Sequence, residues 1–328
     1  MTTTPSSLAD DYRALREGCG LADLSDRGRL ELLGADRQRF LNGYITCDVK
    51  ALAPGSGAYG FLTSNQGRIL ADAVVLAQAD RLWLDLPPGK SSEISGHLSK
   101  YILADQVEIV PLDDMMPLAL IGPRAAEVLG EEAVAALGDG PWRHARVKVH
   151  GTEVALQRAE RFGAPAFVLW VSASIARLLV KSLREDERVR EVGDEALEVL
   201  RTEAGIARFG QDFGADNFPQ ETGAEEAAVS YTKGCYLGQE VVARIHYRGG
   251  VQKSLRGLVF EAGVAPRSGA ALSFEGREVG AITTVTDSPA LGLPVGLAIL
   301  HKRGAAAGTR LDVDGGGTAE VRDLPLVP

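Results

Sequence analysis

The stretch KGCYLGQE, residues 233–240, places a cysteine beside a glycine and two positions after a lysine. Gly234 and Gly238 permit turn conformations that are closed to other residues, and LGQEVVAR (237–244) is typical of a helix start. Backbone N–H groups at a helix start and a nearby ammonium both stabilise a thiolate. Cys235 is therefore a candidate reactive thiol. The alternative is a small buried residue that fills a turn.

Basic residues surround this cysteine, although the chain as a whole is acidic with a net charge of -9. Residues 233–256 contain one acidic residue, Glu240, and five basic ones: Lys233, Arg244, Arg248, Lys253 and Arg256. We expect Lys233 and Arg244 to bind an anionic ligand or to lower the pKa of the thiol. The alternative is a turn with solvated charges around it. One cysteine cannot supply a metal site of about four ligands, so a metal role would need ligands from another molecule.

Two carboxylates, those of Glu203 and Asp72, occupy positions where an acidic side chain is unfavourable. Glu203 falls in the last turn of the helix predicted over 194–205, where a negative charge opposes the helix dipole by ~0.3–1 kcal/mol. It is a candidate to hold a planar heterocycle that bears an amino group, or else to pair with Arg201 or Arg208. Asp72 interrupts the apolar strand ILADAVV. Burial there would raise its pKa and suit it to proton transfer, and the alternative is an outward position on the strand.

The elements that position these residues alternate in mixed order up to about residue 250. Strands are predicted over 28–34, 57–86 (with turns at 64–67 and 77–80), 105–112, 116–122, 146–157 and 166–171. Helices are predicted after Ser7 and over 35–46, 91–103, 123–130, 174–186 and 194–205. This order predicts an α+β fold rather than a doubly wound parallel sheet. Beyond 248–253, short strands between Gly, Pro and Asp turns predict a small antiparallel barrel or sandwich.

Composition limits the class of protein. The chain has 328 residues, of which 45% are hydrophobic and 24% charged, so it can bury a sizeable core. Its apolar runs are shorter than the ~20 residues of a membrane span, and its polar N-terminal stretch is unlike a signal peptide. Three widely spaced cysteines predict no disulfide framework. We expect a cytoplasmic protein with no membrane and no direct nucleic-acid partner.

Several stretches together resemble the YgfZ branch of the folate-binding proteins related to the glycine-cleavage T-protein, an aminomethyltransferase. They are FLNGYITCDV (40–49), GAYGFLTSNQGRILADAVV (57–75), RTEAGIARFGQD (201–212), FPQE (218–221) and KGCYLGQEVVAR (233–244). KGCYLGQE is the signature that separates this branch from true T-proteins. The resemblance implies two interleaved α+β domains over 1–250, followed by a C-terminal β-barrel over 251–328. It also implies a monomer that binds tetrahydrofolate.

The same resemblance implies roles for individual residues. Glu203 corresponds to the glutamate that holds the pterin in T-proteins, and Asp72 to one of two paired aspartates after a G-G-I turn, with Ala71 at the neighbouring position. The branch supports assembly or repair of iron–sulfur enzymes, including enzymes that modify tRNA, and its signature cysteine, here Cys235, is implied to be required. The sequence therefore predicts a tetrahydrofolate-binding accessory protein with iron–sulfur client proteins. The alternative is a folate-dependent aminomethyltransferase or one-carbon transferase.

Overall fold

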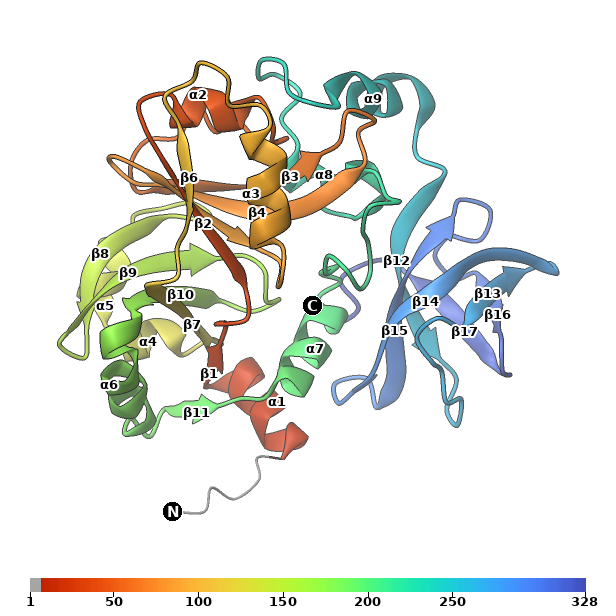
Figure 1. The fold of residues 1–328 in the computed structure, drawn as a ribbon. Coiled ribbons are helices and arrows are strands. Elements are labelled where there is room, and N and C mark those ends of the chain that lie inside the picture. Colours follow the sequence, from red (N-terminus) through yellow and green to blue (C-terminus); the bar gives the residue numbers. More distant parts are fainter. Residues whose placement is uncertain (1–6) are drawn as a thin grey trace.

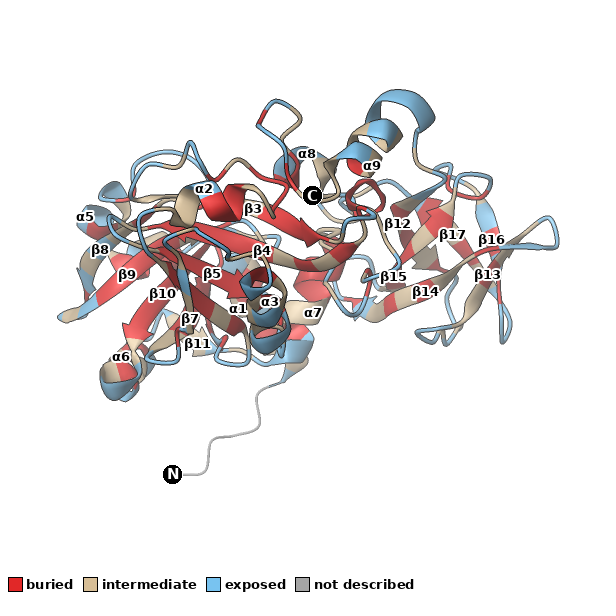
Figure 2. Ribbon diagram, turned by 45° about the horizontal axis from the view of Figure 1, so that its top comes forward, coloured by how far each residue is buried: buried red, intermediate tan, exposed pale blue. Residues whose placement is uncertain are grey.

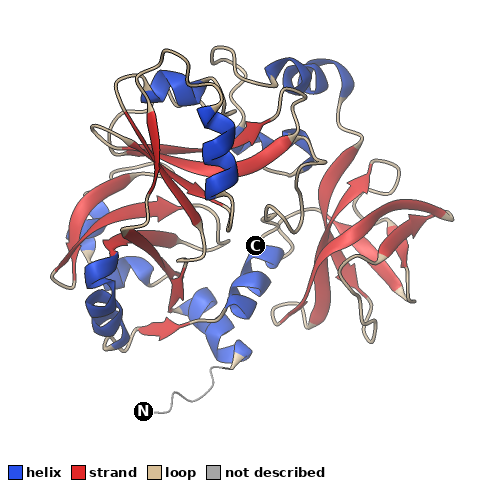
Figure 3. Cartoon of the chain, viewed as in Figure 1, coloured by secondary structure: helices blue, strands red, loops and turns tan. Residues whose placement is uncertain are grey.

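The computed structural model describes residues 7–328; residues 1–6, which begin the polar N-terminal stretch, lie outside the described part. Two β-sheets with flanking helices occupy one side of the molecule, and a closed barrel occupies the other (Figure 1). Most strands in both sheets pair antiparallel; among the described strands, β1 and β11 form the one parallel pair. The predicted class, two interleaved α+β regions followed by an antiparallel barrel, is confirmed (Figure 3).

The two sheets are nested in the sequence. The six-stranded sheet has the order β11-β1-β7-β10-β9-β8. Its strands are β1 (Cys19–Asp23), β7 (Met115–Ile121), β8 (His144–Val149), β9 (Thr152–Ala159), β10 (Ala166–Ser172) and β11 (Val189–Glu191). The five-stranded sheet has the order β3-β4-β5-β2-β6 and is inserted between β1 and β7. Its strands are β2 (Gly28–Leu33), β3 (Ser56–Thr63), β4 (Ile69–Ala77), β5 (Leu82–Leu86) and β6 (Glu108–Pro111).

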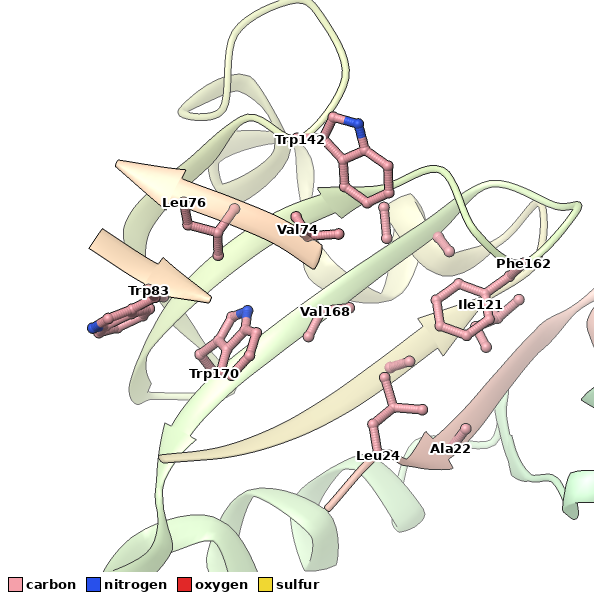
Figure 4. Packing of buried hydrophobic residues seen from close by; sticks show 14 of the residues in the cluster. Ala22, Leu24, Val74, Leu76, Trp83, Ile121, Trp142, Phe162, Val168 and Trp170 are labelled. Carbon is pink, nitrogen blue, oxygen red and sulfur yellow. The ribbon is translucent and has the colours of Figure 1, made fainter. Parts of the chain in front are cut away.

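The sheets pack face to face through one buried apolar cluster (Figure 4). Because side chains alternate along a strand, β4 sends Val74 and Leu76 into this cluster and turns Ala73 and Val75 to the opposite face. From the six-stranded sheet, Trp170 of β10 contributes the largest of the fully buried side chains. Figure 2 shows the strands on both sides of this interface as buried. The inner face of β4 therefore packs against the six-stranded sheet.

Helices cover the outer faces of both sheets. The five-stranded sheet carries α2 (Arg37–Asn42) and α3 (Ser91–Ser99). The six-stranded sheet carries α4 (Ala125–Leu129), α5 (Glu131–Ala135) and α6 (Ala173–Arg184). Helix α1 (Leu8–Glu17), which Ser7 caps through its side chain, packs against α7 (Asp194–Glu203). Of these two helices, α7 lies against the barrel, and α1 packs beside β1 and β11 (Figure 1).

The segment after α7 leads to the barrel through short helices. They are η1 (Pro219–Glu221), α8 (Glu225–Ala228), α9 (Gln239–Arg244) and the π-helical turn η2 (Ile245–Gly249). The closed barrel has the order β12-β15-β14-β13-β16-β17. Its strands are β12 (Lys253–Phe260), β13 (Ala271–Phe274), β14 (Arg277–Ser288), β15 (Leu293–His301), β16 (Arg310–Val313) and β17 (Thr318–Arg322). The final residues return to α7, where the backbone N–H groups of Leu326 and Val327 donate to the carbonyl of Glu203.

Most predicted elements are present with shorter ends. The helix predicted over 35–46 covers only Arg37–Asn42, and the one predicted over 91–103 ends at Ser99. The sequence reading missed β1 and β11, which are short and depend on distant partners. The barrel strands predicted beyond residue 250 end with TRLDVDG (309–315), so the last strand, β17, was also missed.

Candidate functional site

Asp72 lies on the inner face of β4, the face of the five-stranded sheet that packs against the six-stranded sheet. It shares this face with Val74 and Leu76, both of which belong to the apolar cluster between the sheets. The alternative of an outward, solvent-facing carboxylate is therefore wrong. Tyr59 of β3 donates a hydrogen bond of 2.9 Å from its hydroxyl to Asp72 Oδ2. Asp72 Oδ1 is buried and has no hydrogen-bond partner among the residues that the structure describes.

Three further charged side chains complete what we call the buried charge cluster: Arg27, Tyr59, Asp72, Asp85 and Arg161. Asp85 comes from the inner face of β5 and is 1% exposed. It accepts hydrogen bonds from Arg27 Nε through Oδ1 and from an Arg161 terminal nitrogen through Oδ2. Arg27 lies in the turn between β1 and β2, and Arg161 in the turn between β9 and β10. Both sheets and the link between them thus contribute to one cluster.

The two carboxylates of the cluster have opposite electrostatic environments. Burial raises the pKa of Asp72, and the attraction of Arg27, the hydrogen bond from Tyr59 and the attraction of Arg161 counter it only in part. Burial also opposes ionisation of Asp85, but its two guanidinium partners outweigh this effect and hold its pKa below the usual range. Paired carboxyl groups whose environments push their pKa values apart are typical of sites that move protons. Asp72 is the group suited to exchange a proton.

A surface pocket adjoins the turn that carries Arg161. Its volume is about 450 Å³ and it is lined by Arg158, Ala159, Glu160, Gly163, Ala164, Pro165, Ala166, Phe167 and Ile206. This volume falls within the ~300–1,000 Å³ that small-molecule sites occupy. Gly163 packs closely against α7 near Ala204, so the pocket lies between the β9–β10 turn and the end of that helix. The turn therefore takes part in both the pocket and the buried charge cluster.

Glu203 lies at the end of α7 and is completely buried. Tyr12 of α1 donates to its Oε2 at 2.7 Å, and Ser288 of the barrel donates to its Oε1 at 2.5 Å. The alternative of an ion pair with Arg201 or Arg208 is not observed, since both arginines pair with Glu198. Glu203 thus joins α1, α7 and the barrel through these two hydrogen bonds.

Cys235 is exposed, so the alternative of a buried turn cysteine is wrong. Its loop is nevertheless anchored by the residues that follow it, Leu237 and Gly238. The Leu237 N–H donates to the Gly43 carbonyl at 2.9 Å, and the Thr63 hydroxyl donates to the Leu237 carbonyl at 2.6 Å. Gly238 adopts a left-handed conformation against the β3–β4 turn, and a Cβ there would lie 2.4 Å from a carbonyl oxygen. The fold presents this thiol on a fixed loop.

Lys233 and Arg244, which the basic surroundings suggested as partners of a ligand or of the thiol, both have other partners in the structure. The Lys233 ammonium donates to the carbonyls of Asn42, Ile45 and Cys47 at 2.7 Å each. These three bonds occupy all three of its donors, and burial lowers the pKa of Lys233 to about 8. Arg244 is largely exposed and pairs with Glu240 four residues earlier on α9. Lys233 is therefore bound inside the fold, and Arg244 has an ordinary surface ion pair.

Sequence reasoning found Asp72 but missed the four side chains around it. One feature of the sequence could have indicated Asp85. It lies two positions after Trp83, and so on the same face of the strand, and that strand is buried throughout. Arg27 and Arg161 lie in polar turns, where an arginine ordinarily indicates solvent exposure. Their convergence follows from the packing of the two sheets. Across the described part of the chain, no group of three His, Cys, Asp or Glu side chains is arranged to hold a metal ion.

Comparisons with known proteins agree with this architecture. The GCVT N-terminal domain family matches residues 2–233, and the glycine cleavage T-protein C-terminal barrel domain matches residues 253–327. Aminomethyltransferases of Anoxybacillus flavithermus and Bacillus licheniformis are 28% and 29% identical over 316 residues, which cover 94% of this chain and 86% of each relative.

A solved structure shares the whole fold. The crystal structure of glycine cleavage system aminomethyltransferase T from Bartonella henselae matches with a TM-score of 0.89 and 24% identity, covering 99% of this chain and 91% of that one. No helix within residues 7–328 has the length and apolar character to cross a membrane. With family matches that span both sheets and the barrel, this chain belongs to the glycine-cleavage T-protein family.

Proposed function

We propose that this protein binds tetrahydrofolate and acts in folate-dependent one-carbon transfer; its similarity to proteins named aminomethyltransferase supports a transferase role. The observation that carries the proposal is the Tyr59–Asp72 pair, which leaves one buried carboxylate oxygen, Asp72 Oδ1, without a partner in the described chain. A buried acceptor of this kind is costly unless a ligand or a water molecule satisfies it. A reduced pterin carries N–H donors that suit such an oxygen.

The residues of the cluster have separable roles in this proposal. A bound tetrahydrofolate would supply the amine nitrogens that accept a one-carbon unit. Asp72 accepts a hydrogen bond at Oδ1 and, with its raised pKa, exchanges a proton there. Tyr59 fixes Asp72 through Oδ2 and stacks on Trp142 with ring centroids 6.0 Å apart. This aromatic pair helps to exclude water from the inner face of β4.

The missing second aspartate does not remove this arrangement. By the resemblance, Ala71 stands where T-proteins have the other of the two paired aspartates, and its side chain belongs to the core on the opposite face of β4. Because adjacent strand residues point to opposite faces, a carboxylate at position 71 would not enter the buried charge cluster. The loss of that carboxylate is compatible with transferase chemistry at Asp72.

Tetrahydrofolate titration of the wild type, Asp72→Asn and the exposed control Asp314→Asn tests the proposal. We expect Asp72→Asn to bind about tenfold more weakly, as loss of one charge-assisted hydrogen bond would cause, and Asp314→Asn to bind like the wild type. Ammonia release and methylene-tetrahydrofolate formation are then measured with an aminomethyl-lipoyl carrier protein. A wild type that shows no binding would refute the proposal. Binding without either product would restrict it to a folate-binding role.

A second candidate function rests on Cys235. Its exposed thiol on a loop fixed at Lys233 and Leu237 supports the iron–sulfur role implied by the KGCYLGQE signature. In this proposal the protein is a folate-binding accessory factor of the YgfZ type, and a client protein supplies any other ligands of a cluster in transit. Replacement of Cys235 by Ser in a deletion strain tests it, with Cys19→Ser as a buried control. Full retention of iron–sulfur enzyme activity in Cys235→Ser would exclude a role for the thiol.

A further inference from the structure

The buried charge cluster pairs its charges unequally. It holds two guanidiniums, Arg27 and Arg161, and two carboxylates, Asp72 and Asp85. Such a set can pair one to one, with each carboxylate taking one guanidinium. Instead both guanidiniums bind Asp85, one to each of its oxygens, and Asp72 is left with a single neutral hydroxyl partner, that of Tyr59.

The strand register explains how Asp85 reaches both arginines. Asp85 pairs across β4–β5 with Val74, whereas Asp72 stands one pleat further along the same face of β4. The two arginines enter from separate turns, Arg27 from the β1–β2 turn and Arg161 from the β9–β10 turn. Both are mostly buried, with side chains 19% and 16% exposed. Each is close enough to Asp72 to influence its ionisation, yet neither donates a hydrogen bond to it in the described structure.

We propose that Asp85 is a positioning residue that holds Arg27 and Arg161 away from direct pairing with Asp72, and so keeps Asp72 Oδ1 open for a ligand. The inference rests on the proposed role of Asp72 in binding folate. Without the Asp85 carboxylate, two buried guanidiniums would lack their anionic partner, and the open oxygen of Asp72 is the nearby acceptor that they would take. Asp85 thereby determines whether Asp72 faces a ligand or an arginine.

A purely structural role for Asp85, the neutralisation of two buried cations, predicts a different outcome. Removal of Asp85 would then lower the stability of the protein without redirecting the arginines. Redirection has a specific signature, because an arginine that turns to Asp72 forms a hydrogen bond to Oδ1, which has no partner in the described wild-type structure. The pKa of Asp72 responds to the same arginines, since it depends on Arg27, Tyr59 and Arg161. Loss of Asp85 should lower the pKa of Asp72, whereas loss of Arg161 should raise it, since Asp85 still retains Arg27 and one attracting cation is gone.

The test is a carboxyl ¹³C NMR titration of the ligand-free protein, with the Asp72 signal assigned through Asp72→Asn. We expect Asp85→Asn to lower the pKa of Asp72 by about one pH unit or more and to weaken tetrahydrofolate binding by about tenfold. We expect Arg161→Met to raise the pKa of Asp72. A crystal structure of Asp85→Asn should show Arg27 or Arg161 bonded to Asp72 Oδ1. A folded variant in which neither arginine bonds Asp72, or in which the pKa of Asp72 is unchanged or raised, would overturn the proposal.

Two features keep this test decisive. If Asp85→Asn does not fold, Arg161→Met remains, and an unchanged or lowered pKa of Asp72 in that variant contradicts the proposed arrangement. The conservative variant Asp85→Glu retains the charge and should keep the pKa of Asp72 near the wild-type value. Because the titration is made without folate, its result is independent of whether the wild type proves to bind folate at all.

Discussion

The three carbonyl contacts of Lys233 give a prediction that separates a structural lysine from a ligand-binding one. Lys233→Met keeps the length of the side chain and removes the ammonium. In the wild type that ammonium donates to the carbonyls of Asn42, Ile45 and Cys47, each at 2.7 Å. These bonds connect the loop of residues 233–240 to the end of α2 and the segment after it. The substitution leaves these acceptors without this donor in a site where Lys233 itself is only 9% exposed.

The expected magnitude follows from two opposing effects. Three acceptors that lose a buried donor cost ~2 kcal/mol each, or ~6 kcal/mol together. The fall in the pKa of Lys233 from 10.5 to about 8 corresponds to ~3.4 kcal/mol against burying the charge, which methionine would relieve. We expect the free energy of unfolding of Lys233→Met to be about 2–3 kcal/mol below that of the wild type.

The dependence of this difference on pH has a definite sign. Between pH 8 and 10.5 the unfolded wild type holds the lysine proton more tightly than the folded state does. The free energy of unfolding of the wild type therefore gains from Lys233 as the pH rises through this range. Lys233→Met lacks that gain, so its deficit should widen toward pH 10.5.

Urea denaturation of both proteins at several pH values measures the effect. Arg244→Met is the matched control, because Arg244 is exposed and pairs only with Glu240 in the described structure; it should change the free energy of unfolding by less than ~0.5 kcal/mol. Folate affinity is measured on the same samples. If Lys233→Met is as stable as the wild type but loses folate binding, the structural interpretation of Lys233 is refuted.

Three other predictions address the remaining candidate residues. Tyr59→Phe removes the hydrogen bond that lowers the pKa of Asp72. The acid limit of activity in a kcat/KM profile should therefore move to higher pH, and an unchanged limit would show that Asp72 does not take part in the reaction. Glu203→Ala leaves two buried hydroxyl donors without their acceptor, and we expect denaturation to show a loss of ~2–4 kcal/mol in the free energy of unfolding. Unchanged stability would argue that Glu203 does not hold α1, α7 and the barrel together. Cys235 should react with iodoacetamide much faster than buried Cys47, whose pKa burial raises to about 12; equal rates by mass spectrometry would contradict the placement of both thiols.

The fold was largely predictable because its signals are local. Alternating apolar strands, the capped helix after Ser7 and the Gly-rich turns beyond residue 250 depend on neighbouring residues in the sequence. The same holds for Asp72. Its apolar neighbours in the strand predicted burial and therefore a raised pKa, and the structure gives a pKa that burial raises.

The rest of the site depends on contacts between distant segments. Arg161 meets Asp85 only because the two sheets pack face to face. Lys233 appears beside glycines in a basic, polar stretch, which indicates solvent exposure, yet its acceptors lie almost two hundred residues earlier in the chain. Sequence alone identifies which residues are unusual, and the packing decides which of them meet.

The insertion of the five-stranded sheet between β1 and β7 also imposes an order on folding. Every strand of that sheet lies between residues 28 and 111, so it can pair as soon as this stretch of chain is available. β1 has to wait for β7 and finally for β11 at Val189–Glu191, and closing such long loops is slow. A growing chain therefore carries an unpaired first strand at least until residues 115–121 have been made, after all five strands of the inserted sheet. The nested sheet can therefore form before the sheet that surrounds it, and the first strand is fixed later than the five strands that follow it.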